Sequence, residues 1–238
     1  MTRSKKKPAK KAPTKTSPAK TKKSQSKGKK KETREKILAA ARNVFSNYPY
    51  HSATIRMIGK LAEIEHPLIS YYFPNKADLF ISVLTEATQK QSRAESEWLD
   101  EVKAMSTTRG LSVYFDHQLD YFRRNPETFC IIALNVVQSE NSEPIPGYHL
   151  IQDTINSTVR TFMEKVPMNA PEYEVEMFCR TLSNHLISFL GAAKFHAPAM
   201  KMDPNSIQYL NWVKDTALYT FLPRLKMMVK RADSGNRQ

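Results

Sequence analysis

The sequence predicts an all-α fold, and three observations lead to that prediction. From residue 32 onward, apolar residues recur at spacings of three and four, which is the period of an amphipathic helix. No stretch of four or more residues alternates as a half-buried strand requires. The chain contains only six glycines, and segments rich in Pro, Asn and Ser separate the periodic stretches. With 40% hydrophobic residues in 238, there is enough apolar material for a packed core.

The first 31 residues differ in composition from the rest. Residues 1–31 contain 14 of the 37 Lys and Arg residues and no acid, so the remaining 23 basic residues balance the 23 acidic ones. This segment therefore carries the whole net charge of +14, and it has no aromatic or branched aliphatic residue. A self-repelling segment with nothing to bury is typical of disorder. We expect a disordered lysine-rich arm that either binds nucleic-acid phosphates without reading sequence or serves only as a solubilising tail.

Residues 32–80 predict three short helices followed by the start of a longer one. The first helix has an apolar face between residues 37 and 45. The second begins after Thr54, whose hydroxyl is a suitable N-cap, and the third has Pro67 in its first turn. Asn75 is a suitable cap for the fourth helix. Two short helices joined by a tight turn have the proportions of a helix-turn-helix, in which one helix fits the major groove of DNA.

Residues 81–238 predict a larger helical domain. The expected helices lie around 111–124, 126–138, 148–166, 172–195 and 207–229. Pro223 is expected to kink or end the last of them.

Several classes of function and location are not expected from this sequence. Cys130 and Cys179 are too few for a disulfide framework or a zinc module, and they suit small apolar positions in a reducing cytoplasm. No apolar run approaches the roughly 18 residues of a membrane helix, and none follows the basic N-terminus, so we expect a soluble cytoplasmic protein. Without a phosphate-binding loop or a recognisable catalytic spacing, we expect no enzyme and no cofactor. Asp116, His117 and Asp120 suggest a solvated helix face more than a metal site.

Three segments of the first domain read ILAAARNVF at 37–45, ATIRMI at 53–58 and YYFPNKADLF at 71–80. In these segments, and in Glu65-His66-Pro67 at the start of the third helix, the chain resembles the DNA-binding domain of TetR-family transcriptional repressors. The resemblance spans residues 33 to about 84. It implies a cytoplasmic regulator, associated with the nucleoid, that binds DNA as a dimer and responds to a small molecule.

The resemblance also implies which residues contact DNA. On the third helix, His66 can bond to a purine edge, and Leu68 offers apolar contact to a thymine methyl. Arg56 is expected to reach a base or phosphate, and Lys76 to hold the phosphate backbone. The full expected set is Thr54, Arg56, His66, Pro67, Leu68, Ser70, Tyr71, Tyr72 and Lys76.

One departure from the family pattern lies in the turn before the third helix. The family usually has Gly where a positive φ is needed, and this chain has Glu63, which predicts modest strain or a slightly altered turn. Glu63 and Glu65 also place negative charge near the expected DNA face. Residues 32–80 hold six basic and five acidic residues, so we expect the lysine-rich arm to supply nonspecific attraction that this domain lacks.

For the second domain, the resemblance implies a dimer interface made by the last two helices. The expected residues are Phe178, Leu182, Leu186, Phe189, Leu210, Val213 and Phe221, although a stripe of this length could equally be the core of one subunit. Aromatic and Met residues of the middle helices predict either an apolar effector pocket or ordinary core packing. Those residues are Tyr114, Phe115, Tyr121, Phe122, Phe129, Phe162 and Met163.

Taken together, the sequence predicts a sequence-specific transcriptional regulator, a repressor, that binds a palindromic operator and is released by a hydrophobic effector. The alternative is a nucleoid-type protein that binds any DNA and responds to no effector. The two differ in whether the protein distinguishes one duplex sequence from another.

Overall fold

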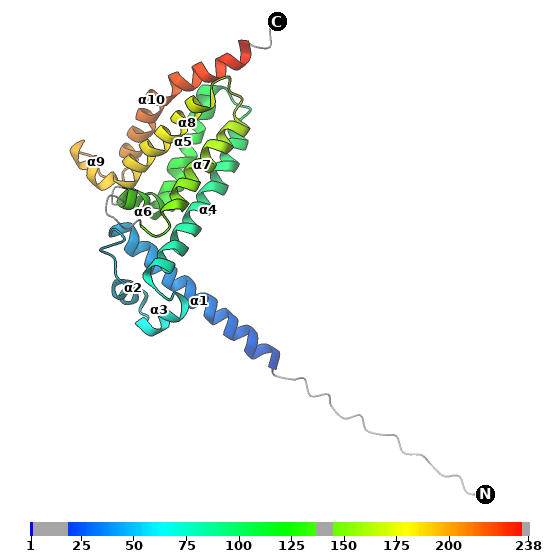
Figure 1. Ribbon diagram of the computed structural model, residues 1–238, viewed down its shortest axis with the longest axis vertical. Helices are drawn as coiled ribbons and strands as arrows, with labels where there is room; N and C mark the ends of the chain where they lie inside the picture. Colours follow the sequence, from blue (N-terminus) through cyan, green and yellow to red (C-terminus); the bar gives the residue numbers. More distant parts are fainter. Residues whose placement is uncertain (2–18, 137–144, 235–238) are drawn as a thin grey trace. The chain divides into compact units, whose positions relative to one another are not determined.

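The computed structural model describes Met1 and residues 19–136 and 145–234, and in this part of the chain every regular element is a helix (Figure 1). The all-α prediction is confirmed. No helix among the described residues is long and apolar enough to cross a membrane. Residues 1–36 and 37–238 form two separate units, and each is described by itself.

Helix α1 (Ala19–Asn47) begins well before the position that the sequence predicts. The expected disorder of residues 1–31 is therefore wrong for residues 19–31, while residues 2–18 lie outside the described part. Pro18 is the last proline before Pro49, and the intervening Lys, Ala and Gln residues have good helix propensity, so a helix can run between them. The hydroxyl of Thr33 donates to the Lys29 carbonyl at 2.9 Å within α1, so Thr33 lies inside this helix.

The two short helices that follow share one small apolar core with parts of α1 and α4. Helices α2 (Ile55–Ala62) and α3 (His66–Tyr72) pack with the end of α1 and the start of α4 (Lys76–Val102). As predicted, Thr54 caps α2 by accepting from the Met57 N–H, and Asn75 caps α4 by accepting from the Asp78 N–H. The core contains Ile37, Phe45, Ile58, Ile69, Phe80 and Leu84, all nearly inaccessible to solvent.

The remaining helices form the larger domain at the expected places. They are α5 (Thr107–Arg124), α6 (Pro126–Val136), α7 (Tyr148–Lys165), α8 (Glu172–Leu186), the π-helical turn η1 (Ile187–Gly191), α9 (Ala193–Ala199) and α10 (Ile207–Ser234). Residues 137 and 138, expected in the helix that is α6, lie outside the described part.

The segment 172–195, predicted as one helix, is divided at η1. A Cβ atom at Gly191 would lie 2.4 Å from the Phe129 carbonyl oxygen of α6, so only glycine permits this close approach. The chain then turns into α9.

Pro223 does not end the last helix, and α10 continues to Ser234. Because proline has no N–H, the carbonyl of Tyr219 loses its helical partner at this point.

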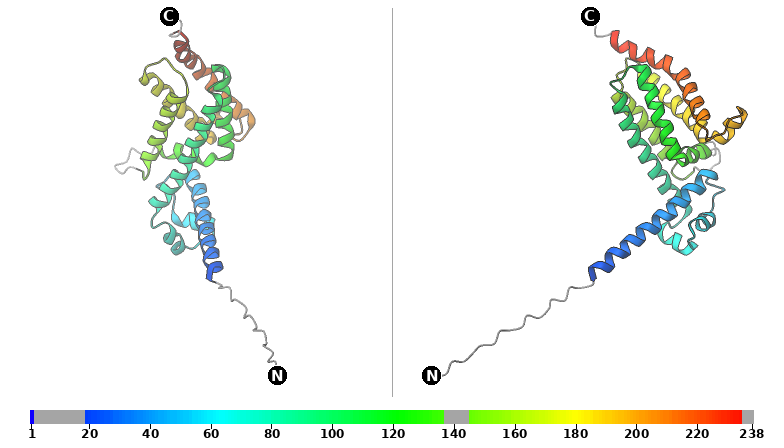
Figure 2. Two further views of the ribbon diagram at one scale, coloured as in Figure 1. Left: turned by 90° about the vertical axis from the view of Figure 1, so that its right-hand side faces the viewer. Right: turned by 180° about the vertical axis from the view of Figure 1, so that it is seen from behind.

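Helix α4 links the two cores of residues 37–238 (Figures 1 and 2). Its first half packs in the small core through Leu79, Phe80 and Val83, and its second half packs in the larger core through Trp98 and Leu99. Ile131 of α6 also packs in the small core. A conformational change in the larger domain can therefore reach the short helices through the packed side chains of α4 and α6.

Candidate functional site

Helix α3 has one buried face and one outward face. Ile69 is completely buried and faces the small core, whereas Leu68 is 44% exposed and Tyr71 is 65% exposed. His66 and Pro67 are also exposed, and Ser70 is half-buried. The hydroxyl of Ser70 lies 3.4 Å from Nδ1 of His66, one turn away. The predicted base-reading residues therefore share a surface on a helix that is anchored by Ile69.

The turn between α2 and α3 depends on two backbone features. Glu63 has φ 53° and ψ 44°, the left-handed conformation that the resemblance implies for this position. A Cβ atom at Gly59 would lie 2.8 Å from the Ile64 carbonyl oxygen, so α2 passes close to the turn. The angle between α2 and α3 is set by this close approach and by the buried residues Ile58 and Ile69.

The remaining residues expected at DNA have unequal access to solvent. Arg56 and Thr54 are exposed at the start of α2, with the Thr54 hydroxyl engaged as a cap. Tyr72 is half-buried against the small core and meets the ring of Tyr71 edge-on at 5.2 Å between centroids. The Tyr72 ring therefore helps to hold α3 in place.

Lys76 is held within its own domain. Its Nζ donates to the carbonyls of Tyr50 at 2.8 Å and Ala53 at 3.0 Å, and lies 4.3 Å from the centre of the Tyr50 ring. Desolvation by burial lowers the pKa of the Lys76 ammonium. Two of its three N–H groups are thus used to fix the loop before α2, and one is left for another acceptor.

The same loop is bonded to the larger domain. The Tyr50 N–H donates to Oδ1 of Asn135 at 2.9 Å, and Asn135, which is buried, donates from Nδ2 to the Ile131 carbonyl within α6. The Tyr50 ring also packs on Phe80 at 4.9 Å between centroids. Helix α6 is therefore fixed to the loop that precedes α2.

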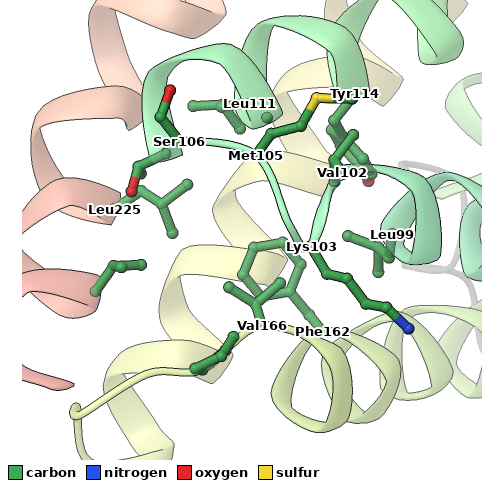
Figure 3. Close-up of a pocket in the computed structure, with 14 residues that line it drawn as sticks. Leu99, Val102, Lys103, Met105, Ser106, Leu111, Tyr114, Phe162, Val166 and Leu225 are labelled. Carbon is green, nitrogen blue, oxygen red and sulfur yellow. The ribbon is translucent and has the colours of Figure 1, made fainter. Parts of the chain in front are cut away.

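The larger domain contains an apolar pocket of about 200 Å³ between α4, α5, α7 and α10 (Figure 3). Its walls include Leu99, Val102, Leu111, Phe162, Val166 and Leu225. Lys103, which also borders it, forms an ion pair with Asp100 at 3.0 Å. Such a lining suits a ligand with a mainly apolar body.

A second, smaller cavity of about 40 Å³ lies on another side of Tyr114. It has a polar part and an apolar part. Gln91, Glu95 and Gln118 are among its polar lining residues, and Phe129, Ile132, Ile155, Leu182 and Leu186 are among its apolar ones. Tyr114 borders both cavities.

The residues expected in the effector pocket are only partly brought together. Tyr114 and Phe162 border the apolar pocket, and Tyr114 and Phe129 border the smaller cavity. Phe115 and Phe122 instead pack in the larger core, and Tyr121, buried in the same core, touches only an open surface groove. Met163 is 38% exposed on the outer side of α7, so its expected place in a pocket is wrong. Helical periodicity identifies the apolar face of a helix, but it does not identify where the packed side chains leave a cavity.

The residues expected at the dimer interface are wrong as a set. Six of them are buried in the core of a single chain and so present no surface to a second subunit, while Phe189 packs partly buried against that core; the set is Phe178, Leu182, Leu186, Phe189, Leu210, Val213 and Phe221. The stripe is the side on which α8 and α10 pack together, as the edge-on contact of Phe178 and Phe221 at 5.6 Å shows. The opposite sides of the two helices are exposed.

Two functional candidates in this domain were missed by the sequence analysis, namely Glu95 and Asn135. Both are buried polar residues. Glu95 falls at the inward spacing shared by Trp98, Leu99 and Val102, so a charged residue at an apolar position was the available signal. Asp116, His117 and Asp120 do not converge, because Asp116 pairs with Lys214, His117 contacts Glu101 and the Asp120 carboxylate pairs with Arg123 at 3.7 Å.

Sequence comparison points to one family. Residues 37–83 match the profile of the family described as bacterial regulatory proteins, tetR family. The HTH-type transcriptional repressor NicS of Pseudomonas putida is 33% identical over 123 residues, 48% of this chain and 57% of NicS. The HTH-type transcriptional regulator RutR of Escherichia coli is 24% identical over 136 residues, 56% of this chain and 57% of RutR. The chain thus spans a little over half the length of these curated relatives.

Structural comparison agrees on the fold. The transcriptional regulator FadR of Bacillus subtilis, solved in complex with stearoyl-CoA, superposes with a TM-score of 0.55 at 16% identity, covering 77% of this chain and 96% of FadR. The TetR transcriptional regulator of Legionella pneumophila superposes with a TM-score of 0.57 at 16% identity, covering 79% and 96%. Residues 37–83 are thus similar in sequence to the tetR family of bacterial regulatory proteins, and the described residues share the fold of solved regulators of that family.

Proposed function

We propose that the protein is a transcriptional repressor that binds a palindromic operator as a homodimer at the nucleoid and leaves the DNA when a small-molecule effector binds. In this proposal residues 32–80 read DNA, and residues 81–238 dimerise and bind the effector. The observation that carries it is the outward face of α3, where His66, Leu68 and Tyr71 are exposed on a helix anchored by buried Ile69.

The contacts with DNA follow from the chemistry of that face. His66, Pro67, Leu68 and Ser70 read base edges, with Leu68 and Pro67 suited to thymine methyl groups and His66 to a purine. Tyr71, Tyr72, Arg56, Thr54 and Lys76 serve the phosphate backbone. Lys76 does so with its remaining N–H while it holds the loop through Tyr50.

The dimer in this proposal uses the exposed sides of α8 and α10. These sides carry Tyr173 and Met177 on α8 and Tyr219 on α10, which is 85% exposed. Tyr and Met are enriched at protein interfaces. The Arg224–Glu174 ion pair at 2.9 Å joins the two helices. Exchanging Met177 and Tyr219 for glutamate is expected to give a monomer in sedimentation, and an unchanged dimer would overturn this interface.

The effector in this proposal occupies the apolar pocket that Tyr114 and Phe162 border. The FadR structure holds stearoyl-CoA, and this chain shares its fold, which supports an amphiphilic or apolar ligand here. Ligand binding would act on the short helices through α6, whose Asn135 holds the Tyr50 N–H. Ligand binding would also act on the short helices through α4, which packs in both cores.

The lysine-rich arm adds nonspecific attraction to phosphates in this proposal. A protein with that arm alone would bind every duplex with similar affinity. The test is to incubate the pure protein with fragmented genomic DNA and to sequence what is retained. A regulator enriches a few fragments that share a palindrome and binds them on the order of a thousandfold more tightly than random duplex. Retention of all fragments in proportion to their length would support the nucleoid-type alternative instead.

A further inference from the structure

We propose that the smaller cavity beside Tyr114 binds the ammonium group of a small primary amine, with the carboxylate of Glu95 as its counter-charge. The cavity was not part of the function proposed above, which places the effector in the apolar pocket. Binding of an amine is therefore tested without DNA and is supported or rejected separately from repression.

The first argument is the position of Glu95. Its side chain is 4% exposed, in the middle of α4, and it borders the cavity. It accepts hydrogen bonds from the Tyr114 hydroxyl at 2.6 Å and the Thr158 hydroxyl at 2.7 Å. Among the described residues, no Lys, Arg or His forms an ion pair with it. A buried carboxylate without a cation is costly, so a ligand that brings positive charge has much to gain there.

The second argument is a pair of amide oxygens at the same cavity. Oε1 of Gln118 and Oε1 of Gln91 are buried and have no hydrogen-bond partner within the described part of the chain. Gln118 itself is only 2% exposed. Buried polar atoms are almost always bonded, so two unbonded acceptors that border one cavity indicate a missing donor.

The orientation of Gln118 follows from its neighbours. The Tyr114 hydroxyl gives its single proton to Glu95, so it can only accept from Gln118. Nε2 of Gln118 donates to it at 2.9 Å, which fixes the amide and leaves Oε1 as the acceptor without a partner. Gln118 therefore presents an acceptor to a ligand, and its own donor is held in another bond.

A primary ammonium group matches this set. It has three N–H donors and one positive charge, as required by one carboxylate and two amide oxygens. The volume of about 40 Å³ exceeds the 10–15 Å³ or so that one water needs. Much of the remaining lining is apolar, with Phe129, Ile155 and Leu186 among it, and suits a short hydrocarbon group. A water molecule, by contrast, is neutral and has two donors for three acceptors.

The test compares ligands of one shape and different charge. The full-length protein is titrated in calorimetry and in thermal melts with butylamine and benzylamine, and with benzyl alcohol and benzoate as neutral and anionic counterparts. We expect one or both amines to raise the melting temperature by about 3–6 °C at ten times their Kd. We expect the alcohol and the carboxylate to have no effect.

Two variants on α4 assign the binding to the cavity. Glu95→Gln keeps the shape and removes the charge, and we expect it to weaken amine binding at least about tenfold, as for the loss of a charged hydrogen bond. Glu97→Gln, which changes an exposed carboxylate two residues away, is the matched control and should bind amines as the wild type does.

Three results would overturn the proposal. These are the absence of binding by either amine, equal binding of benzyl alcohol, and undiminished amine binding by a folded Glu95→Gln variant. The first would mean that the cavity holds buried water only. If Glu95→Gln does not fold, the comparison of amine with alcohol in the wild type still decides whether positive charge is recognised.

Discussion

At the scale of single residues, Glu95 is a buried carboxyl group, with only 4% of its surface exposed. Burial raises the pKa of its carboxyl above the usual value, although hydrogen bonds from Thr158 and Tyr114 act in the opposite direction. The unfolded chain therefore releases this proton at lower pH than the folded chain does. The contribution of Glu95 to stability is largest below its ordinary pKa of about 4.3 and is lost as pH rises from there toward the raised value.

This shift predicts a pH-dependent effect of Glu95→Gln. The variant has no proton to lose, so its free energy of unfolding relative to the wild type should increase between about pH 4.5 and about pH 7.5. Urea unfolding of both proteins at the two pH values measures it, and Glu97→Gln, on the exposed side of α4, should show no such change. If the difference in unfolding free energy between variant and wild type is the same at both pH values, the pKa of Glu95 is not raised in the folded protein.

The left-handed conformation of Glu63 leads to a second prediction. A residue with a Cβ atom is disfavoured at φ 53°, and glycine is not, so Glu63→Gly should stabilise the protein by about 1 kcal/mol. For a chain of this size the melting temperature should rise by about 2–4 °C. Gly59→Ala is the opposing control and should lower it, because the new Cβ atom meets the Ile64 carbonyl. A lower melting temperature for Glu63→Gly would show that this side chain stabilises the turn.

Residue identity alone could not place Lys76 or the pocket residues. A lysine at the start of α4 predicts a contact with phosphate, but the structure shows it bonded to the Tyr50 and Ala53 carbonyls. Those carbonyls become available only when the loop folds over α4, which no local pattern reveals. Met163 was expected in a pocket because Met fills apolar space, yet it lies on the outer side of α7.

At the scale of elements, substitutions on helix α3 test the proposed function most directly. Leu68→Ala removes an outward apolar group without touching the buried Ile69, so the melting temperature should hardly change. Affinity for the cognate duplex should fall about tenfold or more, as when one base in the site is no longer recognised. Met163→Ala, which shortens a similarly exposed side chain on α7, is the control in a fluorescence-anisotropy titration. Equal affinity of wild type and Leu68→Ala for the cognate duplex would contradict the proposal that α3 reads bases.

The order and ends of the helices were largely predictable, because caps and period are local. Thr54 and Asn75 cap α2 and α4 as their residue types predict. The division at η1 was not predictable, since it depends on the contact of Gly191 with Phe129 of α6. The surface against which the apolar stripe on α8 and α10 packs was not predictable either. The helical periodicity of the sequence shows that one face of each helix is apolar. Only the folded structure shows that this face packs within the same chain.

At the scale of the whole molecule, charge is concentrated at the N-terminus. Residues 1–31 hold the net charge of +14, whereas residues 32–80 have six basic and five acidic residues. The structure extends helix α1 back to Ala19, so part of the lysine-rich segment has a regular backbone. Nonspecific attraction and sequence reading are thus expected from different parts of the chain.

Removing residues 1–31 tests that division. The slope of log K against log salt should become shallower by about 0.9 for every phosphate that the arm neutralises, so the truncated protein should bind DNA with a weaker salt dependence. Its preference for cognate over scrambled duplex should remain. A variant with the lysines of this segment replaced by glutamine is the control for loss of the helix itself. An unchanged slope in both variants would mean that the arm does not touch DNA.

The most direct measurement is the ratio of dissociation constants for a duplex recovered from genomic DNA and for its scrambled counterpart, at one salt concentration. If α3 reads bases, full-length protein should give a ratio on the order of a thousand, and alanine at Leu68 or Ser70 should reduce it markedly while α3 stays folded. A ratio near one for the wild type, or a ratio that these substitutions leave unchanged, would contradict the central claim.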